Sequence, residues 1–160
     1  MTIKTGERMP EGSFGIMGEN GPESLSASEL FSGKKVVLFS VPGAFTPTCS
    51  AKHLPGFVEH ADALTAKGVD TIACLAVNDT FVMDAWGKHA GCGDKVLMLA
   101  DGNAEYTRKL GLELDASGFG MGTRGQRFSL IVNDGVVEQV NIEGPGEFKV
   151  SSAEHALGQL

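Results

Sequence analysis

Cysteine is scarce in this sequence, with only Cys49, Cys74 and Cys92 among 160 residues. An odd number of widely spaced cysteines excludes the disulfide framework on which small secreted domains depend. The first ten residues also lack the continuous apolar core of a signal peptide. We therefore expect a reducing compartment and a cytoplasmic location.

Long apolar runs and basic charge are lacking as well. No stretch approaches the ~20 apolar residues of a membrane-spanning helix, so no membrane span is expected. Lysine and arginine number 13 against 20 acidic residues, which gives a formal net charge of -7 and a pI of about 5.0. Because no basic surface is available to neutralise phosphates, nucleic acid is not expected as a partner.

The apolar content is that of a folded protein. Apolar residues make up 42% of the sequence, which fits one packed domain over residues 1–160. Runs of strand length alternate with segments of helical spacing through the first two thirds of the chain. The expected strands are residues 36–41, 71–77 and 95–100, and the expected helices are residues 47–67, 79–89 and 104–110. Such alternation is typical of an α/β sheet.

The last third of the sequence has a different pattern. Strands are expected at residues 128–133 and 136–142, separated by Asp134-Gly135, which is a signal for a two-residue hairpin. The hairpin adds antiparallel strands, so the sheet must be mixed. Ser151 and Glu154 have the spacing of a capping box that would open a final helix. Together these elements outline a thioredoxin-like α/β fold, with a mixed central sheet flanked by helices.

The strongest chemical signal follows the strand at 36–41. Thr46 is placed as the N-cap of the next helix, Pro47 suits its first position, and Cys49 falls in the first turn. There the sulfur faces unpaired backbone N–H groups and the positive end of the helix dipole, which favour thiolate over thiol. Cys49 is therefore a candidate nucleophile, and the alternative is a buried structural thiol.

A helix terminus alone does not stabilise the Cys49 thiolate enough. Lowering the pKa of a thiol from ~8.5 to ~6 needs about 3.4 kcal/mol, whereas a helix terminus supplies at most ~2 kcal/mol. A cation should therefore stand nearby. If the strand at 128–133 runs antiparallel to that at 36–41, Arg127 lies beside the chain end that leads to Cys49. We select Arg127, because a guanidinium stays charged and offers several donors; the alternative is a solvated surface charge.

The redox pair of thioredoxin is missing. That motif places two cysteines three residues apart, and Thr46 stands where the first would be. A lone activated cysteine suits a single attack on an electrophile, with the Thr46 hydroxyl and backbone amides as hydrogen-bonding groups. Simple capping by Thr46 is compatible with that role. The missing cysteine argues against a disulfide reductase or isomerase, and a redox-sensing or holdase module stays open as an alternative.

Residues 41–57, VPGAFTPTCSAKHLPGF, resemble the active-site signature of peroxiredoxins of the Prx5 type, also called type II. The similarity continues in residues 73–79, 84–87 and 127–129, so it covers essentially the whole chain in order. The resemblance implies a thioredoxin fold and a thiol peroxidase that reduces hydrogen peroxide and organic hydroperoxides. It implies neither a metal nor an organic cofactor.

The resemblance also implies a role for each site residue. Cys49 would be the peroxidatic cysteine, which a peroxide oxidises to a sulfenic acid. Pro42 would shield Cys49 from solvent and limit its overoxidation. Thr46 would hydrogen-bond the peroxide through its hydroxyl, and Arg127 would hold both the thiolate and the peroxide oxygens. Relatives are often homodimers, so a homodimer is expected.

The cysteine pattern bears on the reductant. Animal-type members carry a resolving cysteine shortly before the final helix, and residues 146–152 of this chain contain none. Cys74 lies within an apolar strand and is interpreted as a core residue, although plant-type relatives share a cysteine there. Cys92 is expected to be an exposed loop thiol. The resemblance favours a 1-Cys enzyme reduced by glutathione with glutaredoxin, and the alternative is an atypical 2-Cys enzyme that depends on thioredoxin.

Several other residues have both a structural and a functional interpretation. His53 lies four residues later on the same helix face, but two ligands do not make a zinc site, so packing and hydrogen bonding are favoured. Pro55 is expected to kink the helix and so to help present Cys49. Three large apolar residues fall in turn-rich segments, namely Phe45, Phe119 and Met121. They would form a dimer contact, line a pocket for alkyl hydroperoxides or pack in the core.

Overall fold

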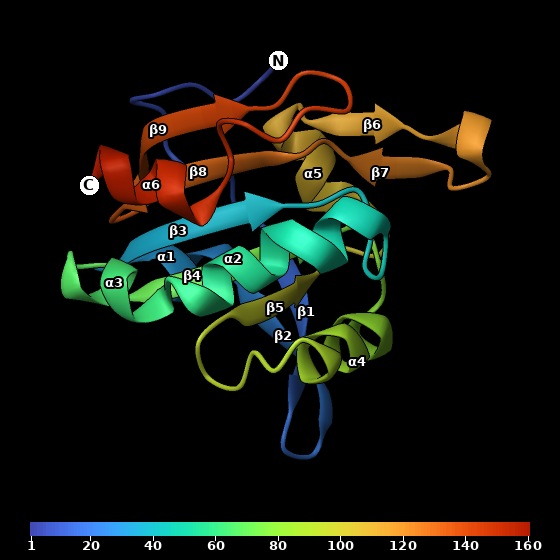
Figure 1. The fold of residues 1–160 in the computed structure, drawn as a ribbon, viewed down its shortest axis with the longest axis horizontal. Helices are drawn as coiled ribbons and strands as arrows, with labels where there is room; N and C mark the ends of the chain where they lie inside the picture. Colours follow the sequence, from blue (N-terminus) through green and yellow to red (C-terminus); the bar gives the residue numbers. More distant parts are fainter.

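A central seven-stranded sheet organises the molecule in the computed structural model, which describes residues 1–160 (Figure 1). The strand order is β2-β1-β5-β4-β3-β8-β9. The strands are β1 (Ser13–Gly18), β2 (Gly21–Ser26), β3 (Lys35–Ser40), β4 (Thr71–Ala76), β5 (Leu97–Ala100), β8 (Phe128–Asn133) and β9 (Val136–Ile142). β3, β4 and β5 are parallel, whereas β8 pairs antiparallel with β3 and β1 pairs antiparallel with β5. The predicted mixed α/β sheet is confirmed.

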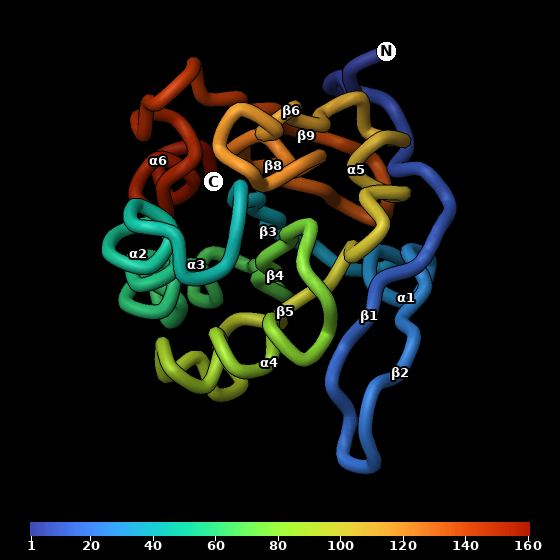
Figure 2. The backbone as a smooth tube through the Cα atoms, turned by 90° about the vertical axis from the view of Figure 1, so that its right-hand side faces the viewer, coloured from blue at the N-terminus to red at the C-terminus, as the bar shows by residue number.

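Helices cover both faces of this sheet. They are α1 (Ala27–Phe31), α2 (Leu54–Glu59), α3 (Ala61–Ala66), α4 (Thr80–His89), α5 (Glu105–Leu110) and α6 (Ala153–Gln159). Figure 2 shows α2, α3, α4 and α6 on one side of the strands and α1 and α5 on the other. A small hairpin of β6 (Glu113–Asp115) and β7 (Thr123–Gly125), closed by the 3-10 turn η2 (Ser117–Phe119), projects from this body (Figure 1).

Alternate residues of β3 supply two separate cores. Val37 and Phe39 belong to the apolar cluster under α2, α3 and α4, while Val36 and Leu38 belong to the cluster under α1 and α5. All four side chains are fully buried. Successive side chains of a strand point to opposite faces, so a continuous apolar run is what a strand with helices on both faces requires.

The predicted hairpin forms at Asp134-Gly135. Both residues have positive φ, 50° for Asp134 and 79° for Gly135, as the tight hairpin turn that matches strand twist requires. The hairpin of β1 and β2 was not predicted. β2 lies at the sheet edge, is largely exposed and carries Pro22, so its sequence lacks the apolar alternation of a strand packed on a core.

The final helix begins one residue later than predicted. Its N-cap is Ser152, whose hydroxyl accepts a hydrogen bond from the backbone N–H of His155 at 3.1 Å. Ser151 is instead fully buried and donates its hydroxyl to Glu143 at 2.7 Å. The capping box of Ser151 and Glu154 is therefore wrong, because a tertiary partner holds Ser151.

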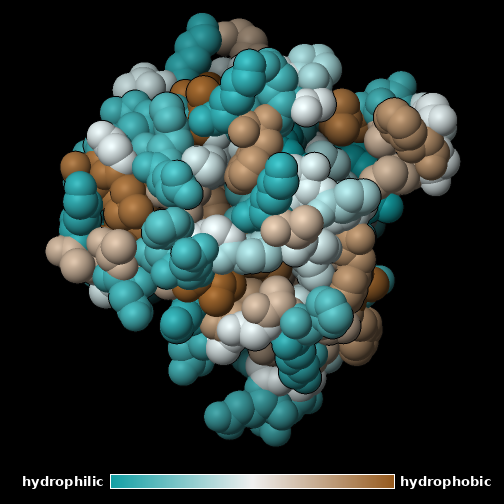
Figure 3. Space-filling model, in the orientation of Figure 1, coloured by the Kyte–Doolittle hydropathy of each residue, from teal (hydrophilic) through white to brown (hydrophobic).

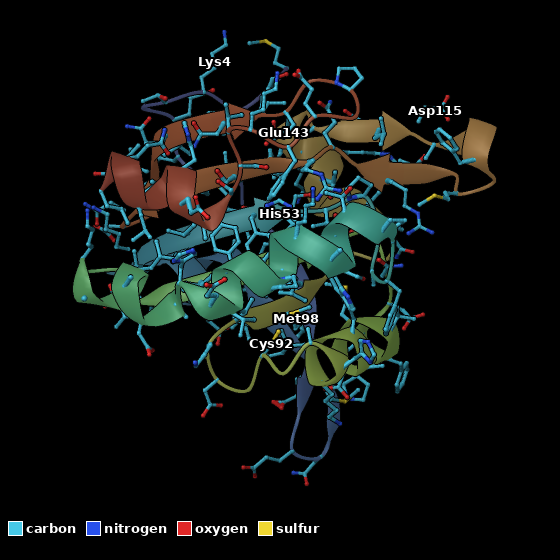
Figure 4. All side chains as sticks on the ribbon, viewed as in Figure 1. Lys4, His53, Cys92, Met98, Asp115 and Glu143 are labelled. Atoms are coloured by element: carbon cyan, nitrogen blue, oxygen red, sulfur yellow. The ribbon has the colours of Figure 1, made fainter.

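Cys92 is not the exposed loop thiol that the sequence suggested. Its exposure is 2%, and it packs in the same apolar cluster as Trp86 and Val96. Gly91 and Gly93 flank it with positive φ of 70° and 51°, which turn the chain so that the thiol faces inward. Figure 4 shows Cys92 near Met98, beside α4. Burial raises the pKa of the Cys92 thiol to about 11.

The helices of the structure are too short and too polar for a transmembrane role: none has both the length and the apolar character needed to cross a bilayer. The longest, α4, has 10 residues.

Replacing Cys92 tests its burial. We expect Cys92→Ser to lower the free energy of unfolding by about 1–3 kcal/mol, because a hydroxyl then enters an apolar site. Cys92→Ala should cost less, since it leaves only a small cavity. Chemical denaturation of both variants measures the difference, and a serine variant as stable as the alanine variant would contradict this burial.

Candidate active site

The loop after β3 delivers Cys49 to a helix start. The backbone N–H of Ser50 donates to the Thr46 carbonyl at 2.9 Å, so the first helical turn begins at Thr46 as predicted. The Thr46 hydroxyl does not cap that turn: it donates to the Gly43 carbonyl at 2.7 Å. Its single proton is thereby committed, and toward any other group the Thr46 oxygen can only accept.

Cys49 opens a wide turn of the helix. Residues Cys49–His53 form the π-helical segment η1, and the N–H of Leu54 donates to the Cys49 carbonyl, five residues back. Pro55 follows at once and has no N–H to donate, so the wide turn lies where the predicted kink was placed. The Cys49 side chain is fully buried.

Arg127 lies beside the sulfur. Antiparallel pairing of β3 with β8 places Ser40 opposite Phe128, so Arg127 stands at the end of β3 from which the chain runs to Cys49. Its Nη2 donates to Cys49 Sγ at 3.1 Å. The structure thus brings together two of the predicted site residues across 78 positions of sequence.

His53 holds the other side of the guanidinium. Arg127 Nη1 lies 2.8 Å from His53 Nδ1, and His53 Nε2 lies 2.8 Å from the Ser151 carbonyl oxygen. The guanidinium can only donate and the carbonyl can only accept, so the imidazole proton must sit on Nε2. Burial, with the charge of Arg127 as a second cause, lowers the pKa of His53 to about 3. His53 is therefore neutral.

The bond from His53 to Arg127 was not predicted from the sequence. The favoured interpretation, packing and hydrogen bonding, agrees with the two contacts of the ring, but it named no partner. The spacing of four residues from Cys49 was the available signal, because it places both side chains on one helix face. No group of three His, Cys, Asp or Glu side chains in the molecule is arranged to hold a metal ion.

A cleft of about 650 Å³ opens above Arg127. Its walls include Pro42, Thr48, Phe119 and Phe148. The Phe148 ring centroid lies 5.9 Å from Arg127 Cζ, so the ring covers the guanidinium. Pro42 thus lines this cleft, whereas Cys49 is fully buried and is not among its lining residues.

The three large apolar residues of the turn-rich segments differ in exposure. Phe45 is 50% exposed and Phe119 is 86% exposed, whereas Met121 is half-buried. Figure 3 shows apolar atoms at the tip of the β6–β7 hairpin, on the right of the view. Phe45 also has a φ of 63°, which a bulky residue adopts rarely, in the loop that leads to Thr46. Exposure thus argues against core packing for Phe45 and Phe119.

Cys74 lies in the core as interpreted. It is fully buried in β4, opposite Phe39 of β3, and belongs to the same apolar cluster as Cys49. Burial, with smaller contributions from Cys49 and Cys92, raises the pKa of the Cys74 thiol well above its usual value. Cys74 is therefore a thiol, not a thiolate, in this arrangement.

Known proteins share this fold and sequence over nearly the whole chain. The model of the Redoxin family matches residues 4–157. The chain is 50% identical to Peroxiredoxin-2B of Arabidopsis thaliana over 99% of this chain and 98% of that protein. Reduced Prx3 of Vibrio vulnificus, solved in complex with H2O2, has a TM-score of 0.95 at 50% identity, and 99% of each chain is covered.

A more distant structure is also similar. The 1-Cys peroxiredoxin of Plasmodium falciparum, an antioxidant protein, has a TM-score of 0.87 at 32% identity and matches over 96% of both chains. The fold is thioredoxin-like, as the sequence predicted. With half of its residues shared with relatives that it matches from end to end, the chain belongs to the redoxin family and is one of its peroxiredoxins, which are thiol peroxidases.

Proposed function

We propose that Cys49 is the peroxidatic cysteine of this thiol peroxidase and that Arg127, Thr46 and Pro42 complete its site. The observation that carries the proposal is the 3.1 Å contact from Arg127 Nη2 to Cys49 Sγ. A guanidinium at that distance in a buried setting favours the thiolate, because an anion removed from water needs a nearby cation. Hydrogen peroxide and small organic hydroperoxides are the proposed substrates.

The proposed chemistry needs no group beyond the chain and the peroxide. The Cys49 thiolate attacks the terminal oxygen of R–O–OH, and a sulfur–oxygen bond forms as the O–O bond breaks. The bonding electron pair leaves with RO⁻, which takes up a proton and departs as alcohol or water. Cys49 is oxidised to a sulfenic acid, and the peroxide is reduced.

Three neighbours support that step. The Thr46 oxygen, whose own proton is donated to Gly43, accepts a hydrogen bond from the peroxide O–H. Arg127 stabilises the charge that passes from sulfur to the leaving oxygen. Pro42 lines the cleft above the buried sulfur and limits the access of water. Each neighbour thus acts on a different part of the reaction.

An external thiol is the proposed reductant of the sulfenic acid. Cys74 and Cys92 are both buried thiols whose pKa is raised, so neither offers a thiolate to attack Cys49. A 1-Cys cycle with glutathione and glutaredoxin is therefore favoured, and the 1-Cys relative from Plasmodium falciparum is consistent with it. An atypical 2-Cys cycle with thioredoxin is the second candidate, because Cys74 shares an apolar cluster with Cys49.

A homodimer is part of the proposal. Phe45 and Phe81 are 50% and 65% exposed, and apolar side chains so exposed favour a contact with another molecule. Light scattering of the protein in solution measures the molar mass, which for a dimer is twice the 16.8 kDa of the chain. A monomer at all concentrations would contradict this part.

Single cysteine variants separate the candidate functions. We expect Cys49→Ser to lose peroxide consumption, whereas Cys74→Ser and Cys92→Ser keep it with glutathione and glutaredoxin, because only Cys49 contacts the guanidinium. Mass spectrometry after peroxide treatment should find a sulfenic acid at Cys49. Loss of turnover in Cys74→Ser together with a Cys49–Cys74 disulfide would favour the 2-Cys cycle, and a wild type without turnover would favour a redox sensor or holdase.

Replacing the guanidinium tests its role. We expect Arg127→Leu to slow Cys49 oxidation roughly 10²–10³-fold, since one donor to the developing charge is lost. Stopped-flow fluorescence of Trp86 measures the rate, because its Nε1 donates at 3.0 Å to Ser50, next to Cys49. The control is Arg108→Leu, which removes an equal charge from α5. Equal rates in the two variants would refute the role of Arg127.

The neutral state of His53 predicts an acid sensitivity. In the unfolded chain histidine binds a proton below a pKa of 6.5, whereas in the folded protein it does so only below about 3. Between these values the unfolded state binds more protons, so stability falls as the pH falls, by at most about 1.4 kcal/mol per pH unit. Denaturation across that range should show a smaller slope for His53→Gln than for the wild type, and equal slopes would contradict a neutral His53.

A further inference from the structure

Glu143 is a buried carboxylate outside the set of proposed site residues. It follows β9, where the loop to α6 begins, and its exposure is 8%. Its Oε2 accepts hydrogen bonds at 2.8 Å from the backbone N–H groups of Lys149, Val150 and Ser151, and at 2.7 Å from the Ser151 hydroxyl. One carboxylate therefore fixes three consecutive residues of this loop.

The charge of Glu143 is satisfied without a cation. Burial alone would raise the pKa of the carboxyl, but the Ser151 hydroxyl and the three backbone amides outweigh it and hold the pKa below its usual value. Glu143 takes part in none of the ion pairs of the structure. The carboxylate thus acts on the loop backbone, and no ion pair joins it to Arg127.

The loop that Glu143 fixes is the one that contacts His53. The Ser151 carbonyl accepts the Nε2 proton of His53, and His53 Nδ1 accepts from Arg127 Nη1, each at 2.8 Å. Phe148, in the same loop, packs its ring against the His53 ring at a tilt of 57°, with centroids 4.9 Å apart, and covers Arg127. Figure 4 shows His53 and Glu143 in the same part of the molecule, where this loop passes.

These contacts form a continuous series that ends at the sulfur. Glu143 places Ser151, Ser151 places the His53 ring and fixes its proton on Nε2, His53 orients Arg127, and Arg127 donates to Cys49 at 3.1 Å. A shift of the loop would move the Ser151 carbonyl that accepts from His53. The His53 ring would then no longer hold the guanidinium of Arg127 in its orientation toward Cys49. Misplacement of a reacting partner by about 1 Å can cost on the order of a hundredfold in rate.

We propose that Glu143 is a positioning residue of the peroxidase reaction, acting through Ser151 and His53 to hold Arg127 against Cys49. The inference rests on the proposed function, because it assigns to Glu143 the support of a guanidinium that acts on the Cys49 thiolate. It also predicts which property of Glu143 matters. The side chain must be long enough to bring an acceptor oxygen to the loop amides. Loss of the charge is the smaller change, because a neutral amide oxygen still accepts these hydrogen bonds, although more weakly than a carboxylate.

Three substitutions at Glu143 distinguish the effect of its side-chain length from the effect of its charge. Glu143→Ala removes the acceptor, and we expect oxidation of Cys49 by hydrogen peroxide to slow roughly 10- to 100-fold. Glu143→Gln keeps the length and one acceptor oxygen but no charge, whereas Glu143→Asp keeps the charge but is one methylene shorter. The expected order of rates is wild type, glutamine, aspartate and alanine variant.

A second measurement reports the thiolate without peroxide. Alkylation of Cys49 by iodoacetamide, a neutral reagent, at about pH 7 should follow the same order of rates, because the thiolate is the reacting form. Cys74→Ser and Cys92→Ser substitutions in every protein of the series confine the reaction to Cys49. If the alanine variant does not fold, the ranking of glutamine above aspartate still decides.

A matched control distinguishes positioning from stability. Asp101 is another buried carboxylate, 5% exposed, that accepts hydrogen bonds from the backbone of Tyr106 and Thr107 at the start of α5, on the opposite face of the sheet. Asp101→Ala should lower the Tm and leave both rates unchanged. A Glu143→Ala protein that oxidises and alkylates at the wild-type rate, or an aspartate variant faster than the glutamine variant, would overturn the inference.

The series also shows which proposal has failed. If wild-type Cys49 reacts rapidly with peroxide and the Glu143 variants match it, only the role of Glu143 is refuted. If wild-type Cys49 does not react with peroxide, the proposed function fails, and the role of Glu143 fails with it.

Discussion

The contact between the Arg127 guanidinium and the Cys49 sulfur is the interaction on which the site depends. The sulfur is fully buried, so water cannot stabilise its anion, and the dipole of a helix terminus supplies only about 0.3–1 kcal/mol in ordinary settings. A full charge at 3.1 Å in a medium of low dielectric is a larger effect than that dipole. The antiparallel pairing of β3 with β8, the His53 ring and the Phe148 ring all serve to hold that charge in place.

The sequence predicted the parts of this site that follow from sheet topology. Three local signals each fix the path of the chain. They are the apolar run of a strand buried on both faces, a helix start at Thr46 and a hairpin at Asp134-Gly135. Once β8 is known to be antiparallel to β3, the residue before β8 must lie at the end of β3. That reasoning located Arg127 beside Cys49 without any side-chain coordinates, and the 3.1 Å contact agrees with it.

Side-chain direction within irregular segments was beyond such reasoning. Gly91 and Gly93 correctly indicated a turn, but a turn does not determine whether the residue between them faces solvent or core, and Cys92 faces the core. Ser151 matched a capping pattern, yet the carboxylate of Glu143, just after β9, accepts its hydroxyl proton, and Ser152 caps the helix instead. Both outcomes depend on side-chain packing and hydrogen bonds in the folded structure, which local propensity does not encode.

Arg127 is oriented by a neutral partner, His53, and this suits a guanidinium whose charge has to stabilise the Cys49 thiolate. Arg127 forms no ion pair, and the group that orients it is an imidazole whose pKa is lowered to about 3, so no carboxylate cancels its charge. An acidic partner would orient the guanidinium equally well but would also weaken its attraction for the thiolate. The nearby negative charge, Glu143, is instead bound to backbone amides of the loop. Neutral groups, the His53 ring and the Ser151 carbonyl, therefore orient the guanidinium, and its positive charge remains free to attract the Cys49 sulfur.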